Sequence, residues 1–325
     1  MNRALVTGGH GFIASHLVAG LLEAGVSVRV LDRPGPRLTE SGGLRHSGLD
    51  LLGIREEVEL VEGDLLEPER ADVAVAGCDA VFHLAGRTFP GVAGPAPAET
   101  FEINVRAAWN VFEACRVEGV EKVIFASSPR AYGASTELPY REDGPLRATF
   151  PYDASKAAAE AIARSYAEAY GVTLAITRFA NVYGPGDVTF TRLVPATAIA
   201  VLDGRAPRVR SDGSPRRNFL HVDDAVSGYL AIAAALEGGE AAGEAFNAGG
   251  DPPHSVREVV DLIAELSGAE VVPEYGPGLP TGEARDQFLD SSKLREMTGW
   301  RVAVELREGL VRTLEWYREH PEVRP

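Results

Sequence analysis

Cysteine is scarce in this sequence of 325 residues, which contains only Cys78 and Cys115. Two cysteines provide no disulfide framework, and their spacing is not that of zinc ligands. Both stand in apolar stretches, so we expect them to be small buried core residues. No metal site is expected.

Basic residues are also in short supply, because 32 lysines and arginines stand against 47 aspartates and glutamates, a formal net charge of −15. This balance repels polyanions and excludes a general nucleic-acid binder. No apolar run approaches the ~20 residues needed to span a bilayer, so no membrane association is expected. An apolar strand pattern begins at Arg3 and leaves no room for a secretion signal, which predicts a cytoplasmic protein.

The first half of the chain alternates short apolar runs with longer amphipathic ones. The apolar runs predict buried strands, and the segments between them predict helices. The predicted strands are 4–7, 26–31, 58–62, 80–84, 122–127 and 173–178, and the predicted helices are 13–24, 102–117 and 152–170. Such alternation makes right-handed crossovers. The sequence therefore predicts an α/β fold with a Rossmann-type doubly wound parallel sheet.

The pattern changes after Arg178, where glycine and proline interrupt the chain frequently. Helices are predicted in this part at 193–202, 223–236, 256–266 and 306–318. We expect a dinucleotide-binding domain over residues 1–178 and a smaller, loop-rich α/β domain over 179–325 that binds the substrate. Parts of 217–250 are expected to return to the first domain. Segment 35–47 is rich in Gly, Pro and Ser and predicts a loop.

A glycine-rich loop, Gly8-Gly9-His10-Gly11, joins the first predicted strand to the first predicted helix. Glycines here let backbone amides approach a pyrophosphate at a helix N-terminus. Asp32 ends the second strand, where a carboxylate accepts from ribose hydroxyls and repels the 2′-phosphate of NADP. The sequence thus predicts NAD as cofactor, with Arg33 as the residue that would offset this preference.

Two further strands end in polar residues at the same predicted edge, Asp64 after the third and His83 after the fourth. An open α/β sheet binds its ligands at this edge. We interpret His83 as a structural histidine that is satisfied within the core, and we do not assign it a ligand.

Tyr152 and Lys156 are spaced so that the phenol and the ammonium share one helix face, and Ser128 follows the preceding predicted strand. A nearby cation favours the phenolate, so we expect the pKa of Tyr152 to be lowered from about 10. Tyr152 is therefore the predicted proton-transfer group, with Lys156 and Ser128 as its catalytic partners.

These motifs together resemble the extended short-chain dehydrogenase/reductase family, in its NAD-dependent nucleotide-sugar epimerase/dehydratase branch. The resemblance covers nearly the whole chain. It is carried by the glycine loop, Asp32, Asp64, His83–Gly86, Asn104, Ser128, Tyr132-Gly133, Tyr152 and Lys156, and later by Arg178–Gly186, Arg217–Asp224, Arg285 and Gly299-Trp300.

The resemblance implies the contacts of both ligands. Cofactor contacts are implied for Gly8, Gly11, Phe12, Ile13, Asp32, Asp64, Leu65, Leu84, Ala85, Gly86, Tyr152, Lys156 and Phe179. Contacts with a UDP- or dTDP-linked sugar are implied for Asn104, Ser128, Asn181, Arg217 and Arg285. Members of the family often form homodimers through a four-helix bundle, here from 102–117 and 152–170. The same helices can equally face only the core.

Two departures from the family pattern, Gly86 for alanine and Asn218 for aspartate, are tolerable. Pro129 and Arg130 matter more, because sugar 4,6-dehydratases of the branch carry an Asp-Glu pair there and UDP-glucuronate decarboxylases usually carry glutamate at the second position. The resemblance thus favours a UDP-sugar 4-epimerase that transiently oxidises C4. A decarboxylase, a 4-keto-sugar reductase or dehydratase, and a non-catalytic NAD-sensing protein are the alternatives.

Arg130 also predicts a negatively charged sugar such as a UDP-uronate, because a carboxylate would compensate an arginine desolvated in the sugar pocket. Arg87 and Arg192 lie in loops that can face the same cleft and add positive charge. The alternative is that Arg130 turns outward and pairs with Glu142 or Asp143.

Overall fold

A computed structural model describes the chain except for residues 35–36, 39–43, 88–95, 136 and 280–283. Its centre is a seven-stranded sheet in the order β13-β8-β7-β6-β1-β2-β5, and every neighbouring pair is parallel. The strands are β1 (Arg3–Thr7), β2 (Ser27–Asp32), β5 (Glu59–Glu62), β6 (Ala80–His83), β7 (Lys122–Ala126), β8 (Leu174–Phe179) and β13 (Ala245–Ala248). The strand order reverses between β1 and β6, where a doubly wound sheet opens a crevice for ligands. The predicted fold class is confirmed.

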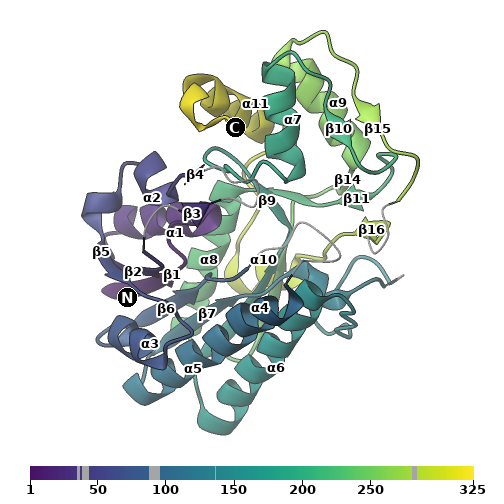
Figure 1. Ribbon diagram of the computed structural model, residues 1–325. Coiled ribbons are helices and arrows are strands. Elements are labelled where there is room, and N and C mark those ends of the chain that lie inside the picture. The colour runs from purple at the N-terminus through teal and green to yellow at the C-terminus, as the bar shows by residue number, and fades with distance from the viewer. Residues whose placement is uncertain (35–36, 39–43, 88–95, 136, 280–283) are drawn as a thin grey trace.

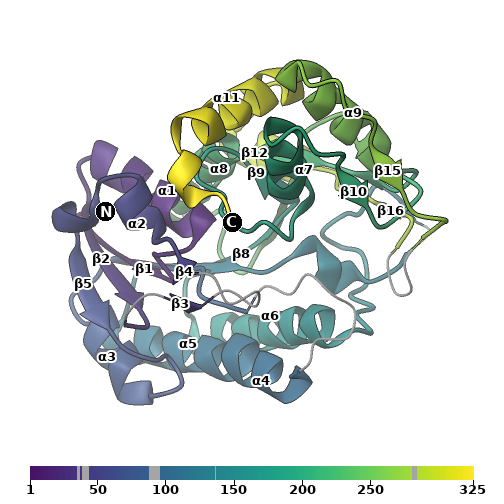
Figure 2. The ribbon, with the colours of Figure 1, turned by 45° about the horizontal axis from the view of Figure 1, so that its top comes forward.

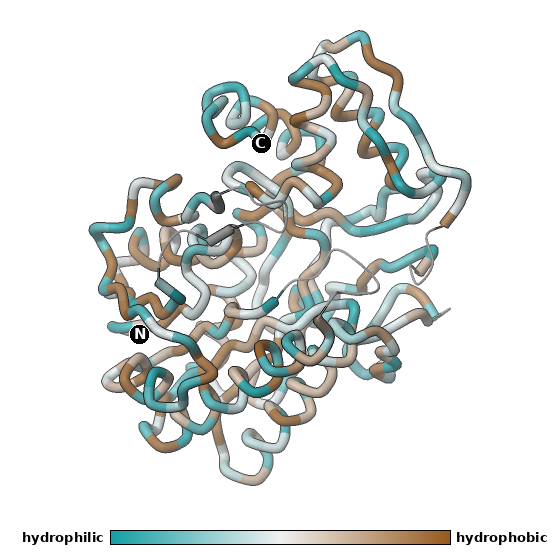
Figure 3. The backbone as a smooth tube through the Cα atoms, in the orientation of Figure 1, coloured by the Kyte–Doolittle hydropathy of each residue, from teal (hydrophilic) through white to brown (hydrophobic). Residues whose placement is uncertain are grey.

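Helices cover both faces of this sheet (Figures 1 and 2). One face carries α1 (Phe12–Glu23), α8 (Val222–Glu237) and α10 (Ser292–Thr298), and the other carries α3 (Pro68–Val75), α5 (Ala107–Glu118) and α6 (Pro151–Tyr170). Successive side chains of β1 point to opposite faces, so Ala4 and Val6 join the first core and Leu5 joins the second. Figure 3 shows the matching alternation of hydrophobic and hydrophilic residues along the helices.

The part after β8 forms a third core above the carboxyl edge of the sheet. It is built on α7 (Leu193–Leu202), α9 (Val256–Ser267) and α11 (Leu306–Glu319). Short strands surround it: β9 (Asn181–Tyr183) pairs with β12 (Phe219–His221), β10 (Arg208–Val209) with β15 (Glu274–Tyr275), and β11 (Arg216–Arg217) lies between β14 (His254–Ser255) and β16 (Asp286–Gln287). The chain returns from this part to the sheet through α8 and β13.

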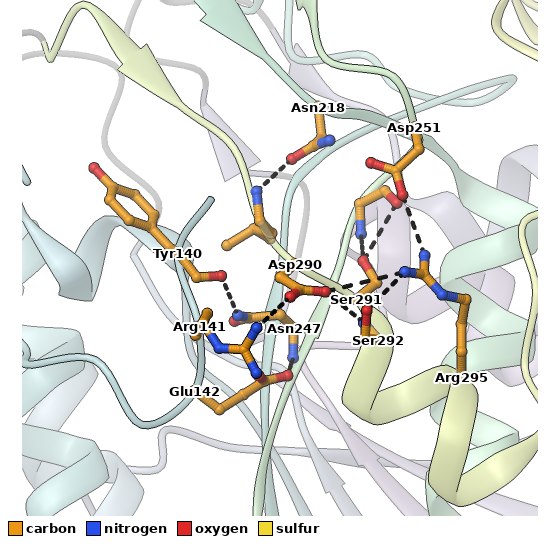
Figure 4. A network of polar contacts seen from close by, with 12 residues as sticks. Tyr140, Arg141, Glu142, Asn218, Asn247, Asp251, Asp290, Ser291, Ser292 and Arg295 are labelled. Carbon is orange, nitrogen blue, oxygen red and sulfur yellow. Dashed lines mark hydrogen bonds and ion pairs between the residues drawn. The ribbon is translucent and has the colours of Figure 1, made fainter. Parts of the chain in front are cut away.

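A network of polar contacts joins the chain at β13, where it returns to the sheet, to neighbouring loops (Figure 4). Asn247 in β13 donates to the Tyr140 carbonyl at 3.0 Å, and its backbone N–H donates to Glu142 at 2.8 Å. Asn218 donates to the Gly250 carbonyl at 2.5 Å and accepts from the Leu289 N–H at 2.7 Å. The buried amides therefore join segments that lie far apart in the sequence.

Several elements differ from those that the sequence predicts. The predicted helix 102–117 begins as a π-helical turn, η2 (Glu102–Arg106), before α5. The predictions did not include β13, α3, α4 (Pro97–Phe101), α2 (Gly48–Leu51), or the 3₁₀ turns η1 (Arg55–Glu57), η3 (Pro129–Tyr132) and η4 (Pro321–Val323). The predicted loop 35–47 lies partly outside the described residues, and within it β3 (Arg37–Leu38) pairs with β4 (Leu44–Arg45). These elements are short, and periodicity carries little signal over two to eight residues.

Cys78 and Cys115 are both buried in the core between the sheet and α5, as predicted. Within the described residues, no helix combines the length and apolarity needed to cross a lipid bilayer.

Candidate active site

A cleft of about 1410 Å³ lies along the carboxyl edge of the sheet, between the sheet and the third core. Its lining runs from the glycine loop and Asp32 past Tyr152 to Arg217 and Gln287. One continuous cleft therefore joins the predicted cofactor residues to residues of the substrate-binding part.

The glycine loop is shaped for close approach of backbone groups. Gly8 has φ of +75°, a conformation that side chains disfavour, and a Cβ there would lie 2.8 Å from the Cα of Ala85. Gly11 donates to the Gly8 carbonyl at 2.8 Å and caps the start of α1. The loop thus presents the N-terminus of α1 to the cleft, as a pyrophosphate site requires.

Asp32 is buried at the end of β2 and lines the same end of the cleft. Its carboxylate accepts from the His10 N–H at 3.0 Å and from the Arg33 N–H at 2.8 Å. The main chain therefore orients this negative charge, which disfavours a 2′-phosphate nearby.

The predicted catalytic residues meet at the middle of the cleft, where β7 ends against the start of α6. Ser128 hydrogen bonds with the phenol of Tyr152. The Lys156 ammonium, one turn further along α6, donates to the Ala126 carbonyl at 2.9 Å. The structure thus brings together the three side chains that the sequence singled out.

The expectation of a lowered pKa for Tyr152 is wrong. Burial raises the pKa of Tyr152, and this outweighs the hydrogen bond from Ser128 and the charges of Arg130 and Arg192, which lower it. Burial also lowers the pKa of Lys156 to about 8, against the opposing charge of Glu160. The cations that act on the phenol are therefore two arginines of the cleft.

Each cleft arginine that was expected to meet an anionic sugar is paired with an acidic side chain. Arg130 pairs with Asp153 (Nε to Oδ1 2.6 Å, Nη2 to Oδ2 3.3 Å), so its expected partners Glu142 and Asp143 are wrong. Arg192 pairs with buried Asp187 at 3.2 Å. Arg87 forms an ion pair with Glu99. Asp153 compensates Arg130, so the desolvation argument for a charged sugar no longer holds.

Most of the predicted site residues line the cleft. These are Gly8, Gly11, Phe12, Ile13, Asp32, Asp64, Leu65, Leu84, Ala85, Gly86, Arg87, Ser128, Arg130, Tyr152, Lys156, Phe179, Asn181, Arg192 and Arg217. Asn104 and Arg285 are not among the lining residues. Asn104 is buried and bonds both the N–H (2.7 Å) and the carbonyl (3.1 Å) of Arg87, and Arg285 is exposed.

Arg217 reaches the backbone of the neighbouring segment. Its guanidinium donates to the carbonyls of Ala284 at 2.7 Å and Arg285 at 2.8 Å. The Arg285 backbone therefore helps to hold Arg217, while the roles of both side chains toward a diphosphate stay predictions.

His83 lies wholly buried at the end of β6, where it hydrogen bonds with the Thr7 hydroxyl at 2.8 Å. Burial, with a contribution from Lys156, lowers the pKa of His83 to about 3, so the ring is neutral. These contacts are those of a structural histidine.

Sequence reasoning missed several cleft residues, among them His10, Asp187, Arg210 and Gln287. His10 stands inside a motif that was quoted for its glycines, and Asp187 directly follows another, so their own side chains drew no attention. Arg210 and Gln287 lie on or beside two-residue strands, and no spacing marks them. Tertiary proximity alone identifies this group.

A Rossmann sheet with a glycine loop, an aspartate at the end of the second strand and a Ser–Tyr–Lys cluster defines a dinucleotide-dependent enzyme of the short-chain dehydrogenase/reductase class. The family model described as NAD dependent epimerase/dehydratase matches residues 4–249. The chain belongs to this family of NAD-dependent enzymes.

Relatives of more than one activity resemble the chain. It is 30% identical to human dTDP-D-glucose 4,6-dehydratase (98% of this chain, 90% of the relative). It is 32% identical to UDP-glucose 4-epimerase of Mycolicibacterium smegmatis (97% and 98%). The crystal structure of dTDP-glucose 4,6-dehydratase from Streptomyces venezuelae with NAD bound is similar at a TM-score of 0.86 and 30% identity (98% of each chain). Full-length likeness to both activities means that the reaction must be argued from the site.

Proposed function

We propose that this protein is a nucleotide-sugar 4-epimerase that acts on a UDP-hexose. The supporting observation is a cluster of Tyr152, Ser128 and Lys156 in the cleft. The two residues that follow Ser128 are Pro129 and Arg130, and neither is acidic. Such a cluster supplies proton transfer at one hydroxyl and nothing for elimination or decarboxylation.

Each side chain of this cluster has its own role in a reversible oxidation at C4 of the sugar. Tyr152 takes the proton of the C4 hydroxyl and later returns it. Ser128, which already bonds the phenol, orients the same sugar oxygen. Lys156 is buried one turn further along the same helix as Tyr152 and would hold the nicotinamide ribose. The glycine loop and Asp32 would hold NAD, which would supply reversible hydride transfer at C4.

Loss of water from a 4-keto sugar needs an acid and a base beside C5 and C6. The positions that hold this pair in the dehydratases of the family are Pro129 and Arg130 here. The acidic side chains that line the cleft, among the described residues, are Asp32, Asp50, Asp64, Glu99 and Asp187. Asp50, Glu99 and Asp187 are in ion pairs, and Asp32 and Asp64 belong to the predicted cofactor site. This arrangement favours epimerisation over dehydration, although relatives of both activities are equally similar in sequence.

A UDP-uronate 4-epimerase is the second candidate. Arg130 and Arg192 both lower the pKa of Tyr152, so two positive charges act on the reacting end of the cleft. Their partners Asp153 and Asp187 offset that charge, which makes a neutral hexose the first choice.

The test is a product analysis with four substrates: UDP-glucose, UDP-galactose, UDP-glucuronate and dTDP-glucose. Each is incubated with the purified protein and NAD, and products are separated and identified by mass and NMR. We expect UDP-glucose and UDP-galactose to interconvert, and Tyr152→Phe to abolish this. A 6-deoxy-4-keto product or release of carbon dioxide would replace the proposal with dehydration or decarboxylation.

A further inference from the structure

The end of β7 is attached to helix α6 by three consecutive residues. The Ala126 carbonyl accepts from the Lys156 ammonium at 2.9 Å. The Ser127 hydroxyl donates to the Glu160 carboxylate at 2.5 Å. The Ser128 hydroxyl bonds the Tyr152 phenol. Positions 152, 156 and 160 are one turn apart and share one face of the helix. Two of these three links belong to the catalytic cluster, and Glu160 makes the third.

Glu160 is wholly buried, with a relative exposure of 0%. The guanidinium of Arg178 in β8 donates two hydrogen bonds to the Glu160 carboxylate, Nε to Oε1 at 2.9 Å and Nη2 to Oε2 at 2.5 Å. The remaining Arg178 nitrogen donates to the Tyr132 hydroxyl at 2.6 Å, and Tyr132 in turn donates to Asn247 at 2.9 Å. A bidentate arginine therefore pairs with the Glu160 carboxylate in the protein interior.

We propose that Glu160 is a positioning residue of the active site, whose carboxylate fixes the end of β7 and supplies the negative charge that faces Lys156. Ser127 lies between Ala126, which accepts from Lys156, and Ser128, which bonds Tyr152. The hydrogen bond from Ser127 to Glu160 therefore fixes the geometry of both neighbours. The role concerns the cluster that each candidate reaction uses, and it holds whichever sugar is turned over.

Among the residues that the structure describes, Lys156 has few other charged neighbours. From β6 it faces His83, which is neutral, and from β7 it meets the Ala126 carbonyl and the Phe125 ring at 5.3 Å. On its own helix lie Tyr152 and Glu160, and Arg178 lies on β8 behind the carboxylate of Glu160. Burial lowers the pKa of Lys156 to about 8, and Glu160 is the charge that opposes this. Loss of that carboxylate would therefore lower the pKa of Lys156 further.

The sequence offers a direct readout, because Lys122, Lys156 and Lys293 are its three lysines. Protein labelled with carbon-13 at the lysine ε-carbons therefore gives three NMR signals, and Lys156→Arg identifies the one that belongs to Lys156. The other two lysines are paired with Glu237 and Glu244 and serve as internal references. Their titration needs no substrate, so the result is independent of the proposed reaction.

The main variant is Glu160→Gln with Arg178→Met, which removes both charges and leaves no unpaired ion in the core. With and without NAD, we expect the pKa of Lys156 to fall by roughly one unit relative to the wild type. Tyr132→Phe is the matched control: it removes a buried hydrogen bond to Arg178 but keeps Glu160, and the Lys156 titration should not move. An unchanged Lys156 titration in the double variant, or an equal shift in Tyr132→Phe, would overturn the charge role.

Two milder variants test the geometry and do not depend on how the double variant folds. Ser127→Ala and Glu160→Asp keep the carboxylate, so the Lys156 titration should stay in place. Loss of the anchor should lower kcat roughly tenfold, as expected for a hydrogen bond to a charged group, while KM for the nucleotide sugar stays the same. If kcat is unchanged in Ser127→Ala, or if KM rises while kcat is retained, Glu160 does not position the cluster.

Discussion

The two ends of the cleft are built in different ways. At the cofactor end the backbone makes the site: Gly8 has a left-handed conformation, and main-chain N–H groups of His10 and Arg33 orient Asp32. At the sugar end side chains make the site, and two of the arginines found there are held by acids: Arg130 by Asp153 and Arg192 by Asp187.

This difference separates a cofactor site of a kind that many enzymes share from a sugar site that is specific to one substrate. A backbone-built site accepts one ligand shape and tolerates few changes, which suits a cofactor that many enzymes use. A site of paired side chains can be retuned by exchanging one partner, which suits a varied substrate. Substitutions at the two ends should therefore differ in kind, and the following predictions test this from the largest effect to the smallest.

Tyr152→Phe, at the junction of the two ends, should have the largest effect. It removes only the phenolic oxygen, so we expect turnover to fall by ~10²–10⁴-fold, as loss of a general acid–base group does. NAD affinity, measured by calorimetry, should be close to that of the wild type. A variant that keeps more than about a tenth of the wild-type rate would show that another group transfers the proton.

Asp32→Ser, at the cofactor end, should change cofactor choice and not sugar choice. The carboxylate repels a 2′-phosphate and accepts from ribose hydroxyls, so its loss should reduce the preference for NAD over NADP by roughly 10–100-fold, the worth of a hydrogen bond to a charged group. Titration of both cofactors measures this. If the preference for NAD over NADP is unchanged, another cleft residue distinguishes the two cofactors, and Arg33 is the next residue to substitute.

Arg130→Met, at the sugar end, should slow all substrates alike. The arginine is 31% exposed, whereas the side chain of Asp153 is 4% exposed, so the change strands a buried carboxylate and removes one of two cations that lower the pKa of Tyr152. We expect kcat/KM near neutral pH to fall roughly tenfold for UDP-glucose and for UDP-glucuronate. Arg141→Met, which breaks an exposed pair with Asp290, is the matched control. A loss confined to the uronate would restore the charged-sugar reading.

Gly86→Ala should have the smallest effect. A Cβ there would lie 3.1 Å from the Asn104 Oδ1 and 3.3 Å from the Lys156 Nζ, so both side chains must move by only tenths of an ångström. Turnover should stay within about twofold of the wild type, a change well under 1 kcal/mol in transition-state stabilisation. A larger loss would mean that Asn104 and Lys156 cannot move by this amount without disturbing catalysis.

The placement of the predicted cofactor residues along the cleft could be read from the sequence because these residues are fixed locally. Gly8, Asp32 and Lys156 stand at fixed places relative to strand ends, and parallel strands bring those ends together without further information. Arg130 shows why the sugar end was harder: its partner Asp153 lies on a different element, and Glu142 and Asp143 were equally plausible from the sequence. β13 was missed for a related reason, because two alanines and a buried asparagine give no strand signal until β8 pairs with them.

The raised pKa of Tyr152 marks the same limit. Spacing placed a cation near the phenol, but burial is a tertiary quantity, and it outweighs the charges that act on this group. The position of a residue can thus be predicted from a motif while the sign of its pKa shift cannot.

The central claim is that one hydride leaves C4 and returns to C4 with nothing else eliminated. The most direct test is proton NMR of UDP-glucose incubated with the protein and NAD in deuterium oxide. The account predicts UDP-galactose that retains hydrogen at C4 and C5. A 4-keto-6-deoxy sugar with deuterium at C5 would contradict it, because water loss across C5 and C6 must break the C5–H bond.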